Sequence, residues 1–247
     1  MDVTTSPRKH HALQLFQGLA HRYDGIGAVM SFGQDPRWRA AMIDAVDPRP
    51  GQRILDVATG TGMVAAALAR RGAHVTGLDQ SDAMLDAARA RHGFDVEFIR
   101  GEAERLPFDD ASFDALTFTY LLRYVDDPAR TMRELARVVA PGGRIGMVEF
   151  GLPPAGPLRA GWRLHTRAGL PLIGRLTSPA WYEVGRFLGP NIERFHAEMP
   201  DLPGLWRAAG IGDVHARSMS FGAGLVMWGA RNAHDGAEPG VAHGRDT

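Results

Sequence analysis

The stretch Leu55-Asp-Val-Ala-Thr-Gly-Thr-Gly62 completes a short apolar run that begins at Arg53, and it precedes an alanine-rich run from Met63 to Arg71. The first run has the length and composition of a buried strand, and the second has those of a helix. Gly60 and Gly62 lack a Cβ and permit a tight turn that a ligand can approach closely. The helix behind them presents unpaired backbone N–H groups. The stretch therefore predicts a strand, a ligand-binding turn and a helix.

The same alternation continues along the chain. After the first unit, strands are predicted over 73–79, 96–99, 113–119 and 144–150, with helices over 82–91 and 128–139. Ser81 is placed to cap the first of these helices, and Pro128 suits the first turn of the second because its missing N–H costs nothing there. Strands that alternate with helices predict an α/β fold with a parallel sheet covered on both faces.

The flanking segments have a different character. Residues 1–50 are predicted to form an N-terminal helical lid and residues 51–230 the main domain. Within that domain, Pro, Gly, Trp and Arg mix with short helical stretches over 151–200, which we interpret as an insertion before a helix over 202–209. Two last strands, over 213–220 and 222–230, are close enough to pair as a hairpin. Residues 231–247 are rich in Gly, His and Asp and are predicted to be a disordered tail.

Composition excludes several classes of function. The chain has 247 residues with 28 Lys+Arg and 28 Asp+Glu, so it lacks the excess positive charge that nucleic-acid binding requires. The absence of cysteine excludes disulfides, thiolate zinc sites and cysteine nucleophiles, and we expect no bound metal. No apolar run is long enough to span a membrane, and the N-terminus lacks the apolar core of a signal peptide, so we expect a cytoplasmic protein. An oligomer is compatible with the sequence.

The predicted turn suits a nucleoside ligand. Asp79 ends the second strand, where its carboxylate can accept hydrogen bonds from both hydroxyls of a ribose. Gly60-x-Gly62-x-x-Ala65 also satisfies the loose dinucleotide pattern, so a nicotinamide-dependent oxidoreductase is an alternative. Asp56 argues against it, because a carboxylate at that position would repel a pyrophosphate but can help to hold a cationic amino-acid group. The acid at Glu102 and the late hairpin also differ from the dinucleotide arrangement.

The run from Ile54 to Phe150 resembles the class I S-adenosylmethionine-dependent methyltransferases. The resemblance lies in the Asp-x-Ala-x-Gly-x-Gly loop, Asp79, the Glu102-Ala103 pair, Asp110-x-x-Phe-Asp114 and Pro141-Gly-Gly143. It implies a Rossmann-like seven-stranded sheet whose last strand is antiparallel, and S-adenosylmethionine as the cofactor. It also implies that the loop lines the methionine part, Asp79 the ribose and Glu102-Ala103 the adenine. The cofactor-binding residues that it implies are Asp56, Ala58, Gly60, Thr61, Gly62, Asp79, Gln80, Glu102, Ala103 and Thr119, with Thr119 near the site of methyl transfer.

A closer resemblance covers most of residues 14–230. Several stretches are similar to the ubiquinone/menaquinone biosynthesis C-methyltransferases: Arg22-Tyr-Asp24, Met30-Ser-Phe-Gly33, Trp38-Arg39, Leu122-Arg123 with Val125, Arg137 through Pro141-Gly-Gly143 to Phe150, and Phe187-Leu188 with Ile192 and Phe195. This resemblance implies methylation of a small aromatic or quinol-type acceptor, with C-methylation in quinone biosynthesis as the leading chemistry. Such an acceptor can be prenylated and membrane-associated, which would place the protein peripherally at the inner face of the membrane.

The chain departs from that family's pattern near the expected acceptor. Tyr124 replaces an Asn, Met63 replaces an Asp, a Tyr-x-Tyr-Leu run is altered around 184–188, and Asn191 replaces a Ser. These departures keep open an O- or N-methyltransferase of secondary metabolism. Arg123 and Tyr124 are the predicted catalytic residues. Arg123 would stabilise a phenolate or orient a water, and the alternative is an ion pair with Asp126 or Asp127.

Further side chains carry weaker hypotheses. Glu149 could face the site or form a buried pair, Tyr23 and Asp24 could line the acceptor pocket, and His165 and His196 are chemically possible bases. The aromatic residues of the insertion predict either a small satellite core or an apolar acceptor pocket; they are Trp162, Trp181, Tyr182, Phe187 and Phe195. A helical stripe of Leu13, Phe16 and Ala20 is expected to pack as part of the lid, with contact to a membrane as the alternative.

Overall fold

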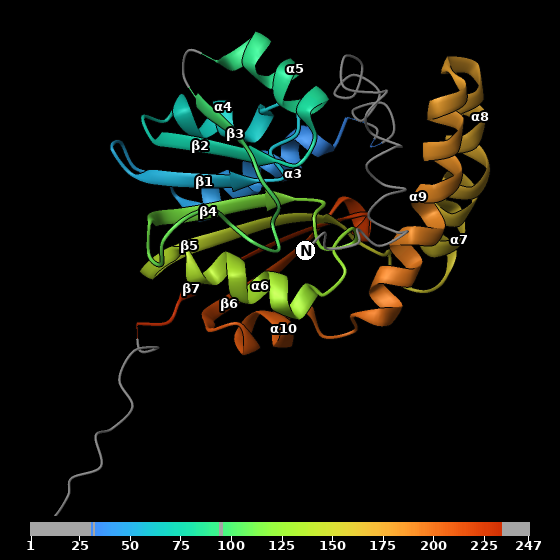
Figure 1. Ribbon diagram of the computed structural model, residues 1–247. Coiled ribbons are helices and arrows are strands. Elements are labelled where there is room, and N and C mark those ends of the chain that lie inside the picture. Colours follow the sequence, from blue (N-terminus) through green and yellow to red (C-terminus); the bar gives the residue numbers. More distant parts are fainter. Residues whose placement is uncertain (1–30, 32, 94–95, 234–247) are drawn as a thin grey trace, which may run out of the picture.

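The computed structural model describes residues 31, 33–93 and 96–233, and these contain one seven-stranded sheet (Figure 1). The strand order is β3-β2-β1-β4-β5-β7-β6. The strands are β1 Arg53–Val57, β2 His74–Asp79, β3 Val96–Arg100, β4 Phe113–Thr119, β5 Val139–Phe150, β6 Ile211–Met219 and β7 Gly224–Arg231. Strands β1 to β5 pair in parallel, and β7 is antiparallel to both of its neighbours. The predicted sheet, including its antiparallel last strand, is confirmed.

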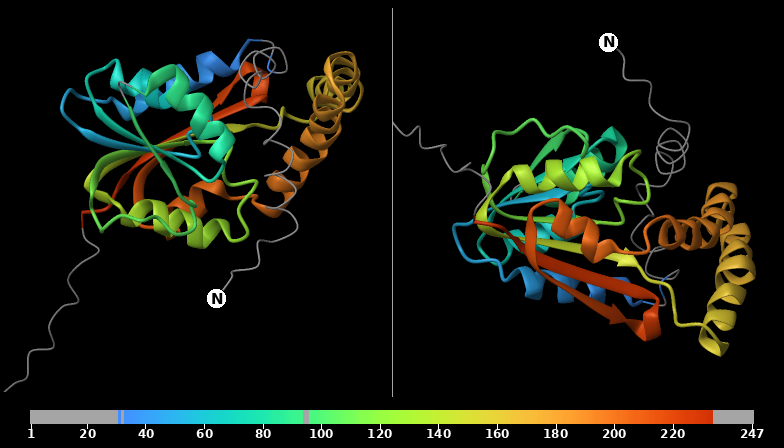
Figure 2. Two further views of the ribbon diagram at one scale, coloured as in Figure 1. Left: turned by 45° about the horizontal axis from the view of Figure 1, so that its top comes forward. Right: turned by 90° about the horizontal axis from the view of Figure 1, so that it is seen from below.

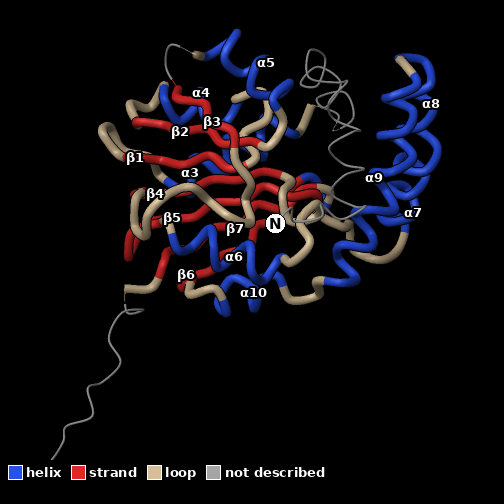
Figure 3. The backbone as a smooth tube through the Cα atoms, viewed as in Figure 1, coloured by secondary structure: helices blue, strands red, loops and turns tan. Residues whose placement is uncertain are grey.

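Helices cover both faces of the sheet (Figure 3). The helices α3 Asp35–Val46, α4 Met63–Ala69 and α5 Asp82–His92 lie on one face, where their apolar side chains share one core with the sheet. The helices α6 Pro128–Arg137 and α10 Leu202–Ala208 lie on the other, in a second core. The predicted caps are present, because the Ser81 side chain accepts a hydrogen bond from the Met84 N–H and Asp127 accepts one from the Arg130 N–H. Each helix thus begins where its sequence signal places it.

The fifth strand begins earlier than predicted. The sequence places Pro141-Gly-Gly143 as a turn between a helix that reaches Val139 and a strand from Arg144, whereas α6 ends at Arg137 and β5 already begins at Val139. Phe113 of β4 pairs with Val139 and Ala115 pairs with Arg144, so the register shifts between these two pairs. Gly142 takes a φ of +77° in the extra residues. The Pro-Gly-Gly segment is therefore an irregularity inside the strand.

The insertion is more regular than predicted. Its presence before the last two strands is confirmed, but its short helical stretches are in fact a helical hairpin that stands beside the sheet (Figure 2). One arm consists of α7 Pro157–Leu164, the π-helix η2 His165–Gly169 and α8 Leu170–Thr177, and the other is α9 Pro179–Glu198. Pro157 and Pro179 occupy first-turn positions, where a proline leaves no hydrogen bond broken. Pro171 lies inside the first arm, directly after the π-helix, because that arm is helical without a break from 157 to 177.

Glycines explain why the insertion was misinterpreted. A Cβ on Gly174 would lie 2.3 Å from the Trp181 carbonyl oxygen, and one on Gly185 would lie 2.6 Å from the Leu170 carbonyl oxygen. A Cβ on Gly189 would lie 2.8 Å from the Thr166 side chain. These residues let the two arms pack backbone to backbone. In the sequence they are typical of loops, since contact between distant segments leaves no local signal.

The predicted lid and tail lie largely outside the described residues. Residues 1–30, 32 and 234–247 are not described, so the stripe of Leu13, Phe16 and Ala20 and the predicted tail keep the status of predictions. The described part of the lid contains α3, which contacts β5 and β7. Arg231, the first residue of the predicted tail, is the last residue of β7. Among the described helices, none combines the length and apolar character needed to cross a membrane.

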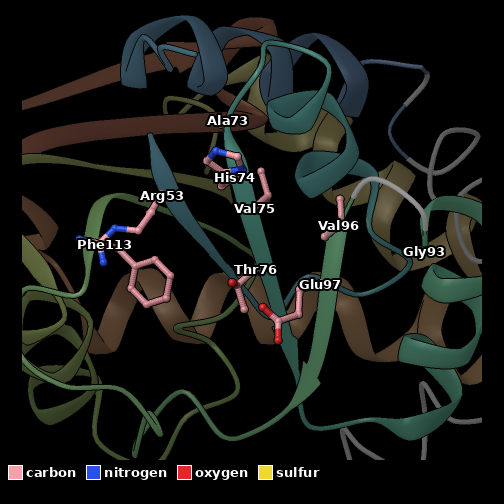
Figure 4. Close-up of a pocket in the computed structure, with 9 residues that line it drawn as sticks. All are labelled: Arg53, Ala73, His74, Val75, Thr76, Gly93, Val96, Glu97 and Phe113. Atoms are coloured by element: carbon pink, nitrogen blue, oxygen red, sulfur yellow. The ribbon is translucent and has the colours of Figure 1, made fainter. Parts of the chain in front are cut away.

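A hollow of about 560 Å³ opens at the amino ends of the strands (Figure 4). It is lined by Arg53, Ala73, His74, Val75, Thr76, Gly93, Val96, Glu97 and Phe113. Four of these are the first residues of strands: Arg53 of β1, His74 of β2, Val96 of β3 and Phe113 of β4. Ligands of open α/β sheets bind at the opposite edge, outside the carboxyl ends of the strands. The hollow is therefore separate from the predicted cofactor site.

Close packing of α3 on β5 gives a first prediction. A Cβ on Gly146 would lie 2.5 Å from Val46 Cγ2 and 3.0 Å from Met42 Cγ, so Gly146→Ala overpacks this contact. We expect a loss of about 1–3 kcal/mol of stability, which lowers the melting temperature by several degrees. The matched control is Gly161→Ala in α7, where nothing lies within 4 Å of the new Cβ. It should leave the melting temperature unchanged or slightly higher. Equal melting temperatures for the two variants would contradict the packing described.

Candidate active site

The glycine turn after β1 lies at the carboxyl edge of the sheet. Gly60 and Gly62 have φ values of +56° and +80°, and Ala58 adopts a φ of +54° although it is not glycine. A Cβ on Gly62 would lie 2.8 Å from the Phe98 ring, so Gly62 is needed for packing. Nothing lies within 4 Å of a Cβ on Gly60. Gly60 therefore borders open space, as a turn that accommodates a ligand requires.

Asp79 connects the ends of β1 and β2. Its Oδ2 accepts a hydrogen bond from the Gly60 N–H at 2.9 Å, and its Oδ1 accepts one from the Ser81 N–H at 2.9 Å. Burial raises the pKa of this carboxyl, and the backbone hydrogen bonds act in the opposite direction. A carboxylate accepts more than two hydrogen bonds, so Asp79 holds the turn in place and keeps capacity for the predicted ribose hydroxyls.

Asp56 is buried beneath the turn and has partners that sequence reasoning missed. The Thr59 hydroxyl donates to Asp56 Oδ2 at 2.6 Å, and the Thr117 hydroxyl donates to Asp56 Oδ1 at 2.7 Å. Burial raises the Asp56 pKa from 3.8 to about 6, although both hydroxyls act to lower it. A signal for Thr117 was present, because it is a polar residue in a run of buried residues within β4.

The remaining predicted cofactor residues lie on neighbouring loops. Thr61 and Ala103 are buried, Gln80 is half-buried, and Glu102 is exposed. Thr119 ends β4, and its hydroxyl accepts a hydrogen bond from Arg39 Nη1 at 3.3 Å. Arg39, which sequence reasoning used only as part of a motif, thus reaches the site from α3. The carboxyl ends of β1, β2, β3 and β4 therefore bring these residues to one edge of the sheet.

Arg123, just beyond β4, is the centre of a buried polar cluster. Its side chain is 1% exposed and that of Glu149 is 0% exposed, and Arg123 Nε lies 2.7 Å from Glu149 Oε1. Arg123 Nη1 donates to Asn191 Oδ1 of α9 at 2.9 Å. The predicted alternative, an ion pair with Asp126 or Asp127, is wrong. Arg123 points inward to the end of β5, and Asp127 instead caps α6.

Tyr124 lies beside this cluster and contacts the insertion. The Arg123 guanidinium lies 4.9 Å from the centre of the Tyr124 ring, and Arg123 Nη1 lies 3.4 Å from the Tyr124 hydroxyl. The ring stacks on Phe187 of α9 with centroids 6.4 Å apart. Burial raises the pKa of the Tyr124 hydroxyl, and Arg123 opposes that shift. The predicted catalytic pair is thus joined to α9 through Asn191 and Phe187, two positions near the departures from the family pattern.

Several weaker hypotheses can now be placed. His196 Nε2 lies 2.8 Å from the Phe150 carbonyl oxygen, which gives this histidine a structural contact. His165 begins the π-helix. Trp162 packs on a small satellite core of Leu170, Leu188 and Ile192, whereas Phe195 belongs to the core of the sheet. Tyr23 and Asp24 lie outside the described residues.

Comparison with known proteins identifies the family. The model of the ubiE/COQ5 methyltransferase family matches residues 4–231. The chain belongs to the ubiE/COQ5 methyltransferase family. It is 39% identical to a demethylmenaquinone methyltransferase of Clavibacter sepedonicus, over 98% of this chain and 95% of that protein. It is 37% identical to a demethylmenaquinone methyltransferase of Thermus thermophilus, over 88% of this chain and 100% of that protein.

Solved structures agree with the fold. A protein of Thermotoga maritima described as a possible histamine N-methyltransferase has a TM-score of 0.60 at 21% identity, over 89% of this chain and 99% of that chain. Phosphoethanolamine N-methyltransferase 2 of Haemonchus contortus, solved with S-adenosyl-L-methionine, has a TM-score of 0.50 at 19% identity, over 74% of this chain and 38% of that chain.

Family membership establishes the type of enzyme. The protein is an S-adenosylmethionine-dependent methyltransferase, and the alternative of a nicotinamide-dependent oxidoreductase is wrong. The site fits this cofactor, because Gly60 borders open space and the Asp79 carboxylate lies at the adjoining strand end. The dinucleotide pattern misled because both classes of fold place a glycine turn after the first strand.

The raised pKa of Asp56 predicts a pH dependence of cofactor binding. The pKa of Asp56 is about 6 in the folded protein, above its ordinary value of 3.8. The charged carboxylate therefore destabilises the folded state at neutral pH, and this destabilisation is lost as the pH falls from about 6 to below 3.8. Protonation also removes the charge that is predicted to attract the cationic groups of S-adenosylmethionine. We expect calorimetry to show affinity decreasing below pH 6 in the wild type. Asp56→Asn should bind more weakly and without this pH dependence, and the exposed control Asp86→Asn should behave as the wild type. The same pH profile in Asp56→Asn and the wild type would refute this role.

Proposed function

We propose that the protein transfers a methyl group to a ring carbon of a quinol of the demethylmenaquinol type. This proposal is supported by relatives that match this chain over most of their length and are named demethylmenaquinone methyltransferases. We also propose that the acceptor is prenylated and that the enzyme works peripherally at the inner face of the membrane, because a prenyl tail partitions into a bilayer.

We propose that the glycine turn and its neighbours hold S-adenosylmethionine, which supplies an electrophilic methyl group on a sulfonium. In this proposal Asp79 binds the ribose, Glu102 and Ala103 the adenine, and Asp56 supports the cationic amino-acid part. Support comes from the position of Asp79, whose two oxygens are oriented by the Gly60 and Ser81 N–H groups. Such fixed orientation matters because alignment of the reacting groups alone can remove roughly 7–11 kcal/mol of the barrier.

The observation that carries the proposed charge stabilisation is the pairing of Tyr124 with a buried guanidinium. Tyr124 is half-buried and Arg123 Nη1 lies 3.4 Å from its hydroxyl, so we propose that this hydroxyl contacts the acceptor. Loss of a proton from a quinol hydroxyl moves negative charge onto the adjacent ring carbon, which makes that carbon nucleophilic. We propose that the Arg123 charge stabilises the quinolate through Tyr124.

Arg123 is suited to stabilise charge rather than to accept a proton. Although burial opposes its charged form, the adjacent Glu149 carboxylate raises the Arg123 pKa above its ordinary value. Burial also raises the Glu149 pKa, against the effect of Arg123. Among the described residues, Glu149 Oε2 and Asn191 Nδ2 have no hydrogen-bond partner although both are buried. We propose that Glu149 receives the proton of the quinol hydroxyl, directly or through a water. After the methyl group has moved from the sulfonium to the ring carbon, that carbon loses its hydrogen as a proton and the oxygen is protonated again, which restores the aromatic quinol.

The acceptor class predicts the outcome of an assay. The purified enzyme is incubated with S-adenosylmethionine and either demethylmenaquinol or a panel of simple phenols and amines. We expect the quinol to be methylated fastest, with the new methyl on carbon and both hydroxyls free, as mass spectrometry and NMR would show. Preferential methylation of an oxygen or a nitrogen would favour the alternative of a secondary-metabolism enzyme and contradict the proposal.

Tyr124 is predicted to act directly on the acceptor. Tyr124→Phe keeps the stacking on Phe187 but removes the hydroxyl, and we expect kcat to fall about 10–100-fold, as for the loss of one hydrogen bond to a charged group. The KM for S-adenosylmethionine and the melting temperature should not change. The control is Tyr182→Phe, a half-buried tyrosine of α9 whose ring contacts Arg186. Wild-type turnover by Tyr124→Phe would show that the hydroxyl takes no part.

A further inference from the structure

The outer face of the arm formed by α7, η2 and α8 is unusually apolar. Five large apolar side chains are strongly exposed among the described residues, and four of them are leucines of this arm: Leu158 51%, Leu164 71%, Leu172 61% and Leu176 82% exposed. The fifth, Phe221, is 83% exposed in a different part of the fold. Exposed apolar side chains that gather on one element are typical of an interaction surface.

The inner face of the same arm is already occupied. Gly174 and Leu170 approach the backbone of α9, and Leu170 packs with Leu188 and Ile192. The arm stands beside the sheet with α9 (Figure 1, right side; Figure 2). The exposed leucines are therefore not part of the hairpin core.

The π-helix brings three of these leucines onto one line. In a regular α-helix, Leu164 and Leu172 would be rotated by about 80° from each other, because eight residues exceed two full turns. The π-helix at His165–Gly169 turns less per residue, which brings Leu172 and Leu176 back toward the side of Leu164. The three leucines therefore form an apolar row along the arm.

Charge indicates what this row contacts. Residues 151–182 contain Arg159, Arg163, Arg167 and Arg175 and no acidic residue, in a chain whose net charge is zero. Glu193 of α9 pairs with Arg163 and with Arg167, at 2.6 Å each. The remaining charged residues of α9 are Glu183, Glu198, Arg186 and Arg194, so the whole hairpin carries six arginines and three glutamates. Leucines beside arginines are typical of helices that lie in the interface of an anionic bilayer.

We propose that the outer face of the α7–η2–α8 arm docks onto the surface of an anionic lipid bilayer, with Leu164, Leu172 and Leu176 in the acyl boundary and the arginines at the headgroups. The inference deepens the proposed function, because it names the surface through which the enzyme meets a membrane-dissolved acceptor. The hairpin also reaches Arg123 and Tyr124 through its other arm, since α9 contacts Arg123 through Asn191 and Tyr124 through Phe187.

The test is flotation of the full chain with vesicles of phosphatidylcholine and phosphatidylglycerol, compared with vesicles of phosphatidylcholine alone. We expect the wild type to bind the anionic vesicles more strongly and to be released by salt. Leu164→Ser, Leu172→Ser and Leu176→Ser combined should weaken that binding by at least about tenfold. Phe221→Ser, which removes an equally exposed apolar side chain elsewhere, should bind as the wild type.

A charge variant and an activity measurement complete the test. Arg175→Glu should weaken binding to anionic vesicles only, and Arg133→Glu, on the exposed side of α6, should have little effect. Turnover of a short-tailed, water-dispersed quinol should be unchanged in the triple leucine variant, while turnover of a long-tailed quinol in vesicles should fall. Vesicle binding is measured without substrate, so its result does not depend on whether the acceptor assignment is correct.

The docking proposal is overturned if the triple leucine variant binds anionic vesicles as tightly as the wild type. If light scattering then shows a wild-type dimer and a monomeric triple variant, the leucine row is assigned to contact between two copies of the chain.

Discussion

The buried ion pair between Arg123 and Glu149 is the interaction on which the acceptor side of the site depends. It joins the loop after β4 to the end of β5, and another nitrogen of the guanidinium, Nη1, donates a hydrogen bond to Asn191 of α9. Removing one member of a buried pair costs about 3–5 kcal/mol, because the other charge stays buried without compensation. The pair therefore fixes the relative positions of three segments that are far apart in the sequence. Tyr124, adjacent to Arg123, takes its position from the same constraint.

Two buried carboxyls hold the part of the site that is proposed to bind the cofactor. Asp56 and Asp79 are buried at the ends of β1 and β2, and burial raises the pKa of each. Hydroxyls of Thr59 and Thr117 and the N–H groups of Gly60 and Ser81 offset part of that cost. Buried carboxyls with raised pKa values and several hydrogen bonds are common at functional sites that need a charged group. In this enzyme the same carboxyls also hold the loops that are proposed to surround the cofactor.

Local sequence signals predicted the parts of the structure that local physics decides. The strand at Phe113–Thr119 and the Ser81 cap were predicted correctly, because strand composition and capping act over a few residues. The helical hairpin was missed because Gly185 and Gly189 are defined by contact with η2 and α8, which lie far away in the chain. The Glu149 partner of Arg123 was missed for the same reason, because Glu149 lies 26 residues further along the chain, whereas Asp126 and Asp127 are neighbours of Arg123 in sequence. The resemblance identified the family from motifs, whereas the contacts of Tyr124 with Phe187 needed three dimensions.

The glycine contacts between the two arms of the hairpin have a mechanical consequence. Because the backbones of α8 and α9 touch at Gly174 and Gly185, no layer of side chains separates them that could deform between the arms. The two arms are therefore coupled directly through their backbones. A displacement of α9 would reach the guanidinium of Arg123 through its hydrogen bond to Asn191. Contact made at the outer part of the insertion is in this way linked to the buried pair of Arg123 with Glu149.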